Sequence, residues 1–578
     1  MRRYTGPPGR EDPMRTTPEA LSTGYRERGY WSDVRIHDLY ARNAAGDPAR
    51  LAVIDPPNRA DLDGATPRRL DYRALSALVD STMCALADAG LRRDDVLVTQ
   101  LPNITEYVAV YLAAARLGIV VSPVPMQFRR GELEPICRLT GARALLTVAR
   151  FKATEPARAA LGVPGVPAVL VLGGDAPPPA RALPLPGANE AGAHRRALEL
   201  EQAAAVSADD ILTICWTSGT EGMPKGVPRS HNHWIAISHA HAEGARLRPG
   251  DTLLNPFPLV NMAAIGGCFM SWLHMAGTLL LHHPFELPVY LQQIATERPD
   301  YAIAPPAVLM LLLQNEALLK DVNLRGLRCV GSGSAPLAPA MIRGYKERYD
   351  IEIVNMFGSN EGVSLMSGPI EAPDAEHRAR YFARFGRPEL EWPQRIARMI
   401  ETRLVDPASG AEIVSPGEPG ELQIRGPTVF DGYLGAPALT AAAFTADRWY
   451  RTGDLFEIAP EEPRFYRFLG RLRTQINRGG FKISPDEIDA VLAEHPDIAE
   501  AGAVGYPDTV LGERVCAVVV PRPGSQVTLE SLRSHFGARG ITPIKWPERL
   551  RIVPALPRNP VGKIVRSEIA AIAAADES

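Results

Sequence analysis

The chain has 578 residues, which is too many for one hydrophobic core, so two or more folded units are expected. Its 63 basic and 66 acidic residues give a net charge of -3, and no long run carries one sign. This balance argues against an electrostatic nucleic-acid binder and favours small-molecule partners. The arginines near the N-terminus precede no apolar segment, and no apolar stretch reaches about 18 residues. We therefore expect neither a signal peptide nor a membrane anchor.

The cysteines are scattered without the CxxC spacing of zinc or redox sites. Most lie in apolar stretches, which predicts buried free thiols rather than disulfides. Such thiols fit a reducing cytoplasm, where we expect the protein to be located. The residues concerned are Cys84, Cys137, Cys215, Cys268, Cys329 and Cys516.

The first clear elements form a strand–helix–strand unit. The run "DDVLVTQ" (94–100) predicts a strand, and Asn103 with Glu106 three residues later predicts a helix start. Gly118 predicts the end of that helix, and "IVVSPVP" (119–125) the next strand. The Pro- and Ala-rich stretch 175–196 predicts an exposed loop.

The same alternation returns later in the chain and predicts a largely parallel sheet covered by helices. Expected strands are 277–283, 300–304, 327–333 and 351–358, and expected helices are 287–297 and 307–314. We therefore assign the chain to the α/β class, with a large N-terminal domain of stacked, mostly parallel sheets over residues 1–472. Residues 1–30 are expected to be a flexible tail.

A smaller pattern begins near residue 473. Ser484 as N-cap, Pro485 at the first helical position and Glu487 at the third predict a helix start there. We expect a small, mobile α+β domain over residues 473–578.

The segment "WTSGTEGMPKG" (216–226) follows an apolar strand at 211–215. Glycines let backbone N–H groups converge on phosphate oxygens, and hydroxyls and a lysine add donors and charge. The P-loop of NTPases requires GxxxxGK[ST], whereas here Gly226 follows Lys225. Taken alone, the segment is also compatible with an ordinary glycine-rich turn. Its donor side chains are Thr217, Ser218, Thr220 and Lys225.

Six segments in a fixed order give the chain a specific resemblance. It resembles the adenylate-forming superfamily of acyl- and aryl-CoA synthetases, nonribosomal peptide synthetase adenylation domains and luciferases. "VPRSHN", "FGSNEG" and "QINRGG" look most like stand-alone aryl-acid ligases of the 2,3-dihydroxybenzoate-AMP ligase type. The six segments are "TSGTEGMPKG" (217–226), "GSGSAP" (331–336), "MFGSNEG" (356–362), "YRTGDL" (450–455), "GRLRTQINRGGFKI" (470–483) and "NPVGKI" (559–564).

The resemblance implies a ligase that joins a carboxylic acid to a thiol, with ATP, Mg²⁺ and coenzyme A as cofactors. Lys563 and Lys225 would supply positive charge where the acid and the α-phosphate meet, as preorganised electrostatic stabilisation requires. Glu361 would help to hold Mg²⁺, which prefers carboxylate and phosphate oxygens. Asp454, with Arg471 assisting, would accept hydrogen bonds from the ribose.

The resemblance also implies the remaining contacts of the site. The phosphates would be bound by Thr217, Ser218, Gly219, Thr220 and Gly222. The adenine side would be formed by Ser334, Ala335, Pro336, Asn355, Met356, Phe357 and Gly358, although Phe357 is equally compatible with a core position. The acid would be bound by Asn261, Met262, Gly333 and Ser359.

Three departures from the usual pattern bear on activity. Glu221 stands where threonine is frequent and adds a negative charge beside the phosphates, which is expected to weaken ATP binding. Asn360 replaces the usual threonine before the glutamate. Asn261 and Met262 stand where the dihydroxybenzoate type has His-Asn, so contacts to ring hydroxyls are not predicted. Because methionine is adaptable, aryl, alkyl and alicyclic acids all stay open.

The histidines at 231, 233, 239 and 241 suggest a metal site, but residues two apart on a helix point away from each other. A polar helix without a metal is the preferred interpretation.

For the second step, the resemblance implies that the small domain rotates about a hinge at Arg473. Asn477, Gly479, Gly480 and Phe481 would then let a pantetheine arm approach the backbone. The acceptor is coenzyme A or, alternatively, the phosphopantetheine of a separate carrier protein. A nucleotide-binding protein without catalysis is a third hypothesis. No nucleic-acid or membrane partner is expected, and the protein is predicted to be a monomer or homodimer.

Overall fold

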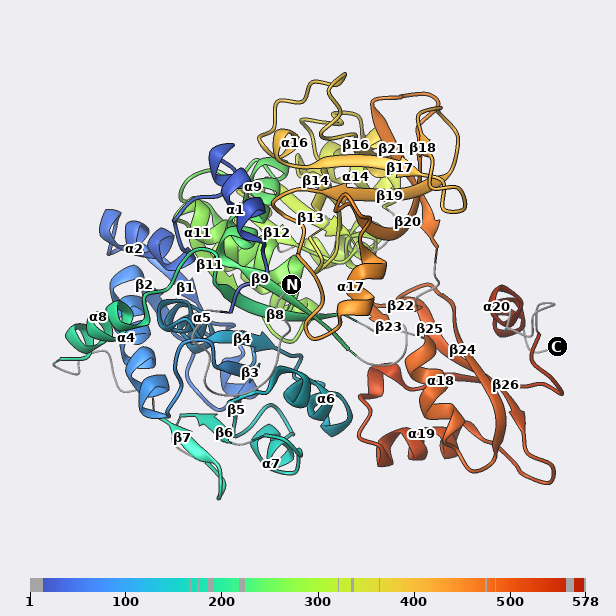
Figure 1. The fold of residues 1–578 in the computed structure, drawn as a ribbon, viewed down its shortest axis with the longest axis horizontal. Helices are drawn as coiled ribbons and strands as arrows, with labels where there is room; N and C mark the ends of the chain where they lie inside the picture. Colours follow the sequence, from blue (N-terminus) through green and yellow to red (C-terminus); the bar gives the residue numbers. More distant parts are fainter. Residues whose placement is uncertain are drawn as a thin grey trace.

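The computed structural model describes most of the chain, and Figure 1 shows a large N-terminal part with a smaller C-terminal domain beside it. The described residues are 14–166, 168–173, 176–184, 192–217, 224–320, 322–333, 337–362, 364–472, 476–483, 485–557 and 566–575.

The first sheet has a parallel centre and antiparallel edges. Its strand order is β15-β14-β13-β12-β10-β11-β1-β2, and only the β14–β15 and β1–β2 pairs are antiparallel in the described chain. The central strands are apolar runs buried on both faces, as expected for a sheet covered by helices. The strands are β1 (Leu51–Ile54), β2 (Arg69–Asp71), β10 (Thr252–Asn255), β11 (Thr278–Leu281), β12 (Tyr301–Ile303), β13 (Cys329–Gly333), β14 (Glu352–Gly358) and β15 (Ser364–Ser367).

The second sheet repeats this design with the order β7-β6-β5-β3-β4-β8-β9. Its β8–β9 pair is antiparallel and its other pairs are parallel. The strands are β3 (Val96–Gln100), β4 (Val120–Pro123), β5 (Ala144–Val148), β6 (Val169–Leu172), β7 (Arg181–Leu183), β8 (Ile211–Thr217) and β9 (Lys225–Ser230).

One apolar core joins the two parallel sheets. It combines strand residues such as Val121 and Leu279 with helix residues such as Leu75, Tyr107 and Trp234, all of them buried. The helices of the N-terminal part are α1 (Glu19–Glu27), α2 (Ile36–Gly46), α3 (Arg59–Leu62), α4 (Tyr72–Asp88), α5 (Thr105–Leu117), α6 (Arg130–Thr140), α7 (Pro156–Leu161), α8 (Ala193–Ala204), α9 (His231–Gly244), α10 (Met262–Ala264), the π-helix η1 (Ile265–Met270), α11 (Ser271–Met275), α12 (Leu287–Glu297), α13 (Pro306–Gln314), the 3₁₀ helix η2 (Glu316–Leu319), α14 (Pro339–Tyr349), α15 (Ala375–Arg380), α16 (Ile396–Met399) and α17 (Pro437–Ala443).

The third sheet is antiparallel, with the order β16-β21-β20-β19-β17-β18. Its aromatic-rich core includes Phe382, Phe456 and Tyr466. The strands are β16 (Tyr381–Ala383), β17 (Glu401–Val405), β18 (Glu412–Ile413), β19 (Gly420–Arg425), β20 (Tyr450–Ile458) and β21 (Phe465–Arg471).

The C-terminal domain has its own sheet and its own apolar core. The order β23-β22-β25-β24 is antiparallel, and β26 runs parallel to β25. The elements are β22 (Ile476–Arg478), β23 (Phe481–Ile483), α18 (Pro485–Ala493), β24 (Ile498–Asp508), β25 (Gly512–Pro521), α19 (Leu529–Ala538), the 3₁₀ helix η3 (Pro543–Lys545), β26 (Arg549–Ile552) and α20 (Arg566–Ala574).

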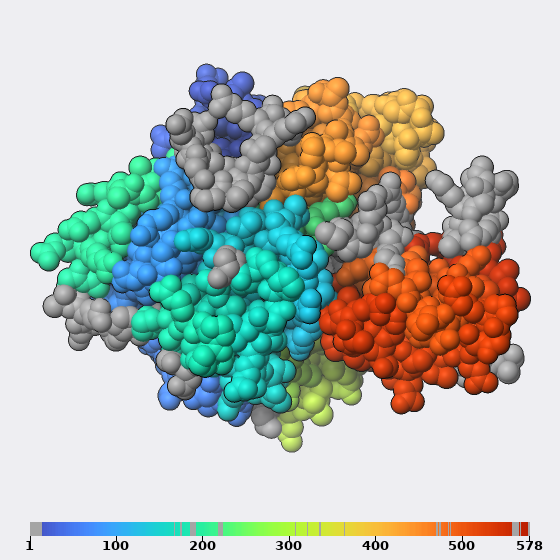
Figure 2. Space-filling model, turned by 60° about the horizontal axis from the view of Figure 1, so that its bottom comes forward, coloured from blue at the N-terminus to red at the C-terminus, as the bar shows by residue number. Residues whose placement is uncertain are grey.

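The two parts meet between α6 and the segment after α19, which lie side by side in Figure 1. The backbone N–H of Thr542 donates to Glu132 Oε1 at 2.9 Å, and Lys545 Nζ lies 3.7 Å from the same oxygen. A Cβ added at Gly131 would lie 3.0 Å from the Arg539 carbonyl oxygen, so glycine allows close approach here. Figure 2 shows the red C-terminal surface against the cyan N-terminal surface.

Most of the predicted elements are confirmed, including the helix end at Gly118 and a helix that begins at Pro485. Asn103 is not the cap of α5, because Ile104 holds that position and the Asn103 amide donates to the Phe257 and His282 carbonyls. Ser484 lies outside the described residues.

Two segments expected to be irregular contain regular structure. The predicted loop 175–196 includes β7 and the first turn of α8. The predicted tail 1–30 includes α1, in which Tyr25 is buried and Arg26 pairs with Asp209 at 2.8 Å. Apolar packing and this ion pair hold that part of the segment in place, while residues 1–13 lie outside the described chain.

Candidate active site

The predicted phosphate-binding segment links strands β8 and β9, and its described ends, Thr217 and Lys225, belong to these strands. The antiparallel register pairs Thr217 with Lys225, so the strands place a hydroxyl and an ammonium group at the same end of the hairpin. The predicted residues Ser218, Gly219, Thr220 and Gly222, and the departure Glu221, lie outside the described residues.

Glu361 is linked to this hairpin through a tyrosine. The carboxylate is 8% exposed and follows β14, and Tyr433 Oη donates to its Oε1 atom at 3.0 Å. Lys225 Nζ lies 5.0 Å from the centroid of the Tyr433 ring, within cation–π range. Burial and the neighbouring Glu361 carboxylate raise the pKa of Tyr433, so its hydroxyl stays protonated and can donate. Tyr433 therefore lies between the predicted phosphate lysine and the predicted metal ligand.

The segment Thr428–Leu434, which we call the strap, holds both sides of this arrangement through its backbone. Phe430 N donates to the Glu361 carbonyl at 2.9 Å, and Leu434 N donates to the Gly226 carbonyl at 2.9 Å. The His233 ring contacts the Val429 carbonyl, with Nε2 and O 3.1 Å apart. These backbone bonds therefore connect Glu361 to the hairpin through the strap.

Arg229 lies beneath the strap and is fully buried. Its guanidinium donates to the Asn360 carbonyl from Nε at 2.7 Å and to the Thr428 carbonyl from Nη1 at 2.9 Å. Burial lowers the pKa of Arg229 to about 10, which still leaves it charged near neutral pH. Because carbonyl oxygens accept its bonds, this buried cation ties the strap to the turn that carries Glu361.

The sequence did not predict roles for Tyr433 or Arg229. Arg229 lies in the quoted segment "VPRSHN" and Tyr433 lies in none of the quoted segments. Their partners are distant in the chain: Glu361 is 72 residues from Tyr433, and Asn360 is 131 residues from Arg229. No local spacing rule could have paired them.

The predicted ribose contacts are adjacent on two strands. In the β20–β21 register Asp454 pairs with Arg471. Asp454 is buried, with only 4% of its surface exposed. The Asp454 N–H donates to Thr452 Oγ1 at 3.1 Å, which fixes the local backbone. The register thus brings together the two residues that the resemblance pairs.

The strands predicted to border adenine and the acid approach very closely. β13 and β14 pair Gly333 with Met356, and a Cβ added at Gly333 would lie 2.1 Å from the Met356 carbonyl oxygen. Glycine is therefore required at this position for the two strands to pack. The predicted residues Ser334, Ala335 and Pro336 lie outside the described chain, and Gly358 ends β14.

Asn355 and Phe357 also have protein partners. The Asn355 amide donates to the carbonyls of Arg378 and Ala379, each at 3.1 Å, so its nitrogen is engaged in the fold. The Phe357 ring is half-buried and packs edge-on against Phe456, with ring centroids 5.1 Å apart. Phe357 thus borders the aromatic core of the third sheet and keeps a partly exposed ring.

The predicted acid-binding segment begins a short helix. Asn261 caps α10 by accepting the Ala264 N–H at 3.2 Å, so its oxygen is used locally. Met262 is 6% exposed and its backbone N–H donates to Asn360 Oδ1 at 2.9 Å. The π-helix η1 follows directly, a feature that is often found at functional sites.

Two buried hydroxyls, Thr217 of the predicted phosphate site and Ser359 of the predicted acid site, fit an anionic ligand. Thr217 Oγ1 and Ser359 Oγ have no hydrogen-bond partner among the residues that the structure describes, and buried polar atoms are normally paired. Both belong to the predicted site. Together with Lys225 they form a donor set suited to an anion.

The carboxylate of Glu361 fits Mg²⁺, which proteins often hold through one or two carboxylates together with substrate phosphates. In the described part of the chain no group of three or more His, Cys, Asp and Glu side chains forms a metal cage.

Of the α9 histidines, His231 and His233 are buried, and His233 Nδ1 lies 2.9 Å from Ser230 Oγ. Helix α9 is thus largely buried rather than the polar helix expected.

The predicted pantetheine residues form a tight hairpin between β22 and β23. Gly479 and Gly480 have φ of +57° and +85°, so the turn itself requires glycine-like conformations. The Asn477 N–H donates to Glu513 Oε2 at 2.6 Å, and Phe481 is 38% exposed. The glycines therefore have a conformational role in addition to the predicted steric one. Lys563 and the hinge residue Arg473 lie outside the described residues.

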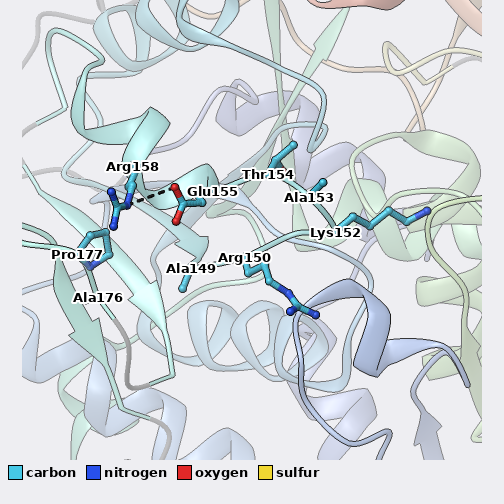
Figure 3. A pocket seen from close by; sticks show the side chains of 9 residues that line it. All are labelled: Ala149, Arg150, Lys152, Ala153, Thr154, Glu155, Arg158, Ala176 and Pro177. Atoms are coloured by element: carbon cyan, nitrogen blue, oxygen red, sulfur yellow. Dashed lines mark ion pairs between the residues drawn. The ribbon is translucent and has the colours of Figure 1, made fainter.

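A surface pocket of about 510 Å³ lies near the carboxyl end of β5, and none of the predicted site residues lines it. In Figure 3 Arg158 and Glu155 form an ion pair, 3.4 Å apart, while Arg150 and Lys152 extend in other directions. The charged groups do not converge on one point. The site built around Glu361 is therefore the better candidate.

The cysteine prediction is confirmed, since all of the cysteines are free and buried. No helix in the described ranges combines the length and apolar character needed to cross a bilayer.

Two family profiles match the sequence: "AMP-binding enzyme" over residues 40–434 and "AMP-binding enzyme C-terminal domain" over residues 487–563. Pyochelin synthase PchD of Pseudomonas aeruginosa is 30% identical over 557 residues, covering 96% of this chain and 95% of that protein. A salicylyl-CoA synthase / salicylate adenylyltransferase of a Streptomyces species is 31% identical, covering 96% of each.

The fold is similar to the solved structure of the amide bond synthetase McbA from Marinactinospora thermotolerans. The TM-score is 0.76 at 24% identity, and the match covers 92% of this chain and 99% of that one. The similarity confirms the predicted architecture of a large α/β domain followed by a smaller C-terminal domain.

Proposed function

The chain belongs to the AMP-binding enzyme family, and on that premise we propose that it is an ATP-dependent acid–thiol ligase. It activates a carboxylic acid as an acyl-adenylate and then forms a thioester with coenzyme A. The observation that carries the proposal is the Lys225–Tyr433–Glu361 arrangement at the end of the β8–β9 hairpin. It provides one cation and one carboxylate beside two buried hydroxyls that have no hydrogen-bond partner among the described residues.

In the first half-reaction a carboxylate oxygen of the acid attacks the α-phosphorus of ATP. A new P–O bond forms, the bond to the β-phosphate oxygen breaks, and pyrophosphate leaves with the electron pair. Two anions must approach each other, so positive charge at the phosphates lowers the barrier. We assign this role to Lys225 and to Lys563. Magnesium, when bound, neutralises phosphate charge, and Glu361 would hold it.

The chain's own residues keep this site ready for reaction. Tyr433 orients the Glu361 carboxylate by donating to one of its oxygens. The Thr217 hydroxyl would donate to a phosphate oxygen and the Ser359 hydroxyl to the acid, since neither has a hydrogen-bond partner among the described residues. Asp454, beside Arg471 on the third sheet, accepts from the ribose hydroxyls in this proposal. We place Asn261 and Met262 on the acid.

In the second half-reaction a thiolate attacks the carbonyl carbon of the adenylate. The C–S bond forms, the C–O bond to phosphate breaks, and AMP leaves. We assign the pantetheine approach to the hairpin at Gly479 and Gly480 and the hinge to Arg473. Coenzyme A is the proposed acceptor because the relative named salicylyl-CoA synthase is similar over 96% of its length. A carrier protein is the alternative, and the pyochelin synthase relative motivates it.

The reaction would take place in the cytoplasm, where ATP and coenzyme A are available and buried thiols such as Cys215 stay reduced. A monomer and a homodimer are both compatible with this chemistry.

Acid-dependent exchange of pyrophosphate into ATP tests the proposal. Aryl, alicyclic and fatty acids should be assayed in parallel, and we expect exchange with at least one of these classes. The best acid is then incubated with ATP and either coenzyme A or a phosphopantetheinylated carrier protein, and the thioester is identified by mass spectrometry. Exchange with no acid of the panel, in a protein that still binds ATP, would favour a nucleotide-binding protein without catalysis.

A further inference from the structure

Asn360, the residue before Glu361, connects three distant segments through one peptide unit and one side chain. Its Oδ1 atom accepts the Met262 N–H at 2.9 Å, and its Nδ2 atom donates to the Trp216 carbonyl at 3.0 Å. Its own carbonyl accepts from Arg229 Nε at 2.7 Å. The residue departs from the threonine that the resemblance leads one to expect.

The two side-chain bonds join the two substrates' predicted binding segments. Trp216 is the next-to-last residue of β8, so its carbonyl lies at the end of the strand that leads into the predicted phosphate-binding segment. Met262 is the first residue of α10, directly after the Asn261 cap. A single amide group thus sets the spacing between the hairpin that would bind ATP and the segment that would bind the acid.

An amide is suited to this position because it carries an acceptor and a donor on separate atoms of one planar group. A threonine has a single oxygen with which to make both bonds, and an aspartate can accept but not donate. Arg229 also fixes the backbone of Asn360, and Arg229 is fully buried. Asn360 is therefore held from three sides, by Trp216, Met262 and Arg229.

We propose that Asn360 is a positioning residue that couples the acid-binding segment to the phosphate hairpin. When ATP binds at the hairpin, the Asn360 amide fixes the backbone at Met262 relative to Trp216, so that the acid is bound in register with the α-phosphate. The coupling is reciprocal: acid bound at Met262 favours the ATP-bound hairpin. This inference rests on the proposed function for its account of the acid, but not for the link between the two segments.

Hydrogen–deuterium exchange with Mg²⁺ and α,β-methylene-ATP, in the absence of any acid, measures the link directly. In the wild-type protein the analogue should slow exchange in peptides from the hairpin and in a peptide spanning residues 259–268. In Asn360→Leu only the hairpin peptides should respond. In Asn360→Asp the Met262 N–H keeps its acceptor, so its exchange in the free protein stays slow while the response to the analogue is lost.

Asn232→Leu is the matched control. Asn232 is also buried and also bridges two segments, since its Oδ1 accepts the Ser32 N–H at 3.2 Å and its Nδ2 donates to Asp209 at 2.8 Å. This variant should keep the response of both peptides. A general loss of packing would instead change the control and the Asn360 variants alike.

The effect of the substitution on acid binding is measured by pyrophosphate exchange with the acid that gives the fastest exchange in the panel. Because the coupling is reciprocal, Asn360→Asp should raise the acid KM measured at saturating ATP and the ATP KM measured at saturating acid by a similar factor, about fivefold or more. A response of the 259–268 peptide that persists in Asn360→Leu would overturn the proposal. If hydrogen–deuterium exchange shows the expected coupling but no acid supports pyrophosphate exchange, the proposed function alone would be contradicted.

Discussion

The two regions assigned to the two half-reactions are built differently. Around Glu361, the strap, Arg229 and Tyr433 fix the carboxylate and the hairpin through backbone and side-chain bonds that span the large domain. Among the described residues, Glu132 of the large domain meets Thr542 and Lys545 of the C-terminal domain. The adenylation site is therefore prebuilt by bonds within the large domain, whereas the polar contacts of the C-terminal domain with it centre on Glu132 in the described part of the chain. Such an attachment suits a domain that must change position between two reactions.

The largest expected effect comes from Lys563→Ala. Removal of one preorganised cation should lower pyrophosphate exchange by about a hundredfold or more. Thioester formation from supplied acyl-adenylate should continue, because in the second step the thiolate attacks the acyl carbonyl carbon. No lysine cation is then needed to bring a carboxylate to the α-phosphate of ATP. Equal loss of both rates would show that Lys563 serves the fold or both steps.

Tyr433→Phe breaks the connection within the prebuilt site. Loss of a hydrogen bond to a charged group costs about 1.5 to 3 kcal/mol, so exchange should fall by about tenfold or more. The loss should be accompanied by a higher Mg²⁺ requirement, because the Glu361 carboxylate is no longer oriented. Isothermal titration of the protein with ATP at several Mg²⁺ concentrations measures this apart from turnover.

Tyr345→Phe is the control for that variant, since Tyr345 is buried and its hydroxyl donates to the Leu309 carbonyl at 3.0 Å. It removes a comparable bond away from the site. If activity and melting temperature decrease to the same extent in both variants, the Tyr433 hydroxyl stabilises the fold rather than orienting the Glu361 carboxylate.

Gly480→Asn tests the C-terminal side of the comparison. Asparagine tolerates positive φ better than other residues with a side chain, so the turn can form while the path beside it narrows. Thioester formation should fall by about tenfold, as expected for a misplaced nucleophile, and exchange should persist. A bulky residue such as tryptophan would strain the backbone at φ +85° and could not separate the two effects. Unchanged thioester formation would remove Gly480 from the pantetheine path.

Glu132→Gln should have the smallest effect. The neutral amide can still accept the Thr542 N–H, and Lys545 keeps its closer carboxylate partner Glu487 at 2.5 Å, so only the weaker attraction across 3.7 Å is lost. Exchange and thioester formation should change by less than about fivefold, in opposite directions. Parallel changes in both rates would show that this contact does not influence the position of the domain.

The sequence predicted what depends on local patterns. Strands such as β3 and β14 carry buried apolar runs, and the hairpin follows from glycines and hydroxyls next to a strand. It did not predict what depends on distant partners. Asn103 has the residue type and spacing of a helix cap, but its amide bonds to Phe257, which is 154 residues away. Tyr433 shows the same limit, because nothing near it in the chain indicates Glu361.

The central claim is that the C-terminal domain takes a different position in each half-reaction. A measured distance between this domain and the large domain tests it most directly. Spin labels at Arg138→Cys and Arg533→Cys lie on exposed positions of α6 and α19, and the native cysteines are buried. We predict one distance with Mg²⁺ and α,β-methylene-ATP, and a second, distinct distance with a non-hydrolysable acyl-adenylate analogue and coenzyme A. The same single distance in both states would contradict the account, since one fixed arrangement would then have to serve both half-reactions.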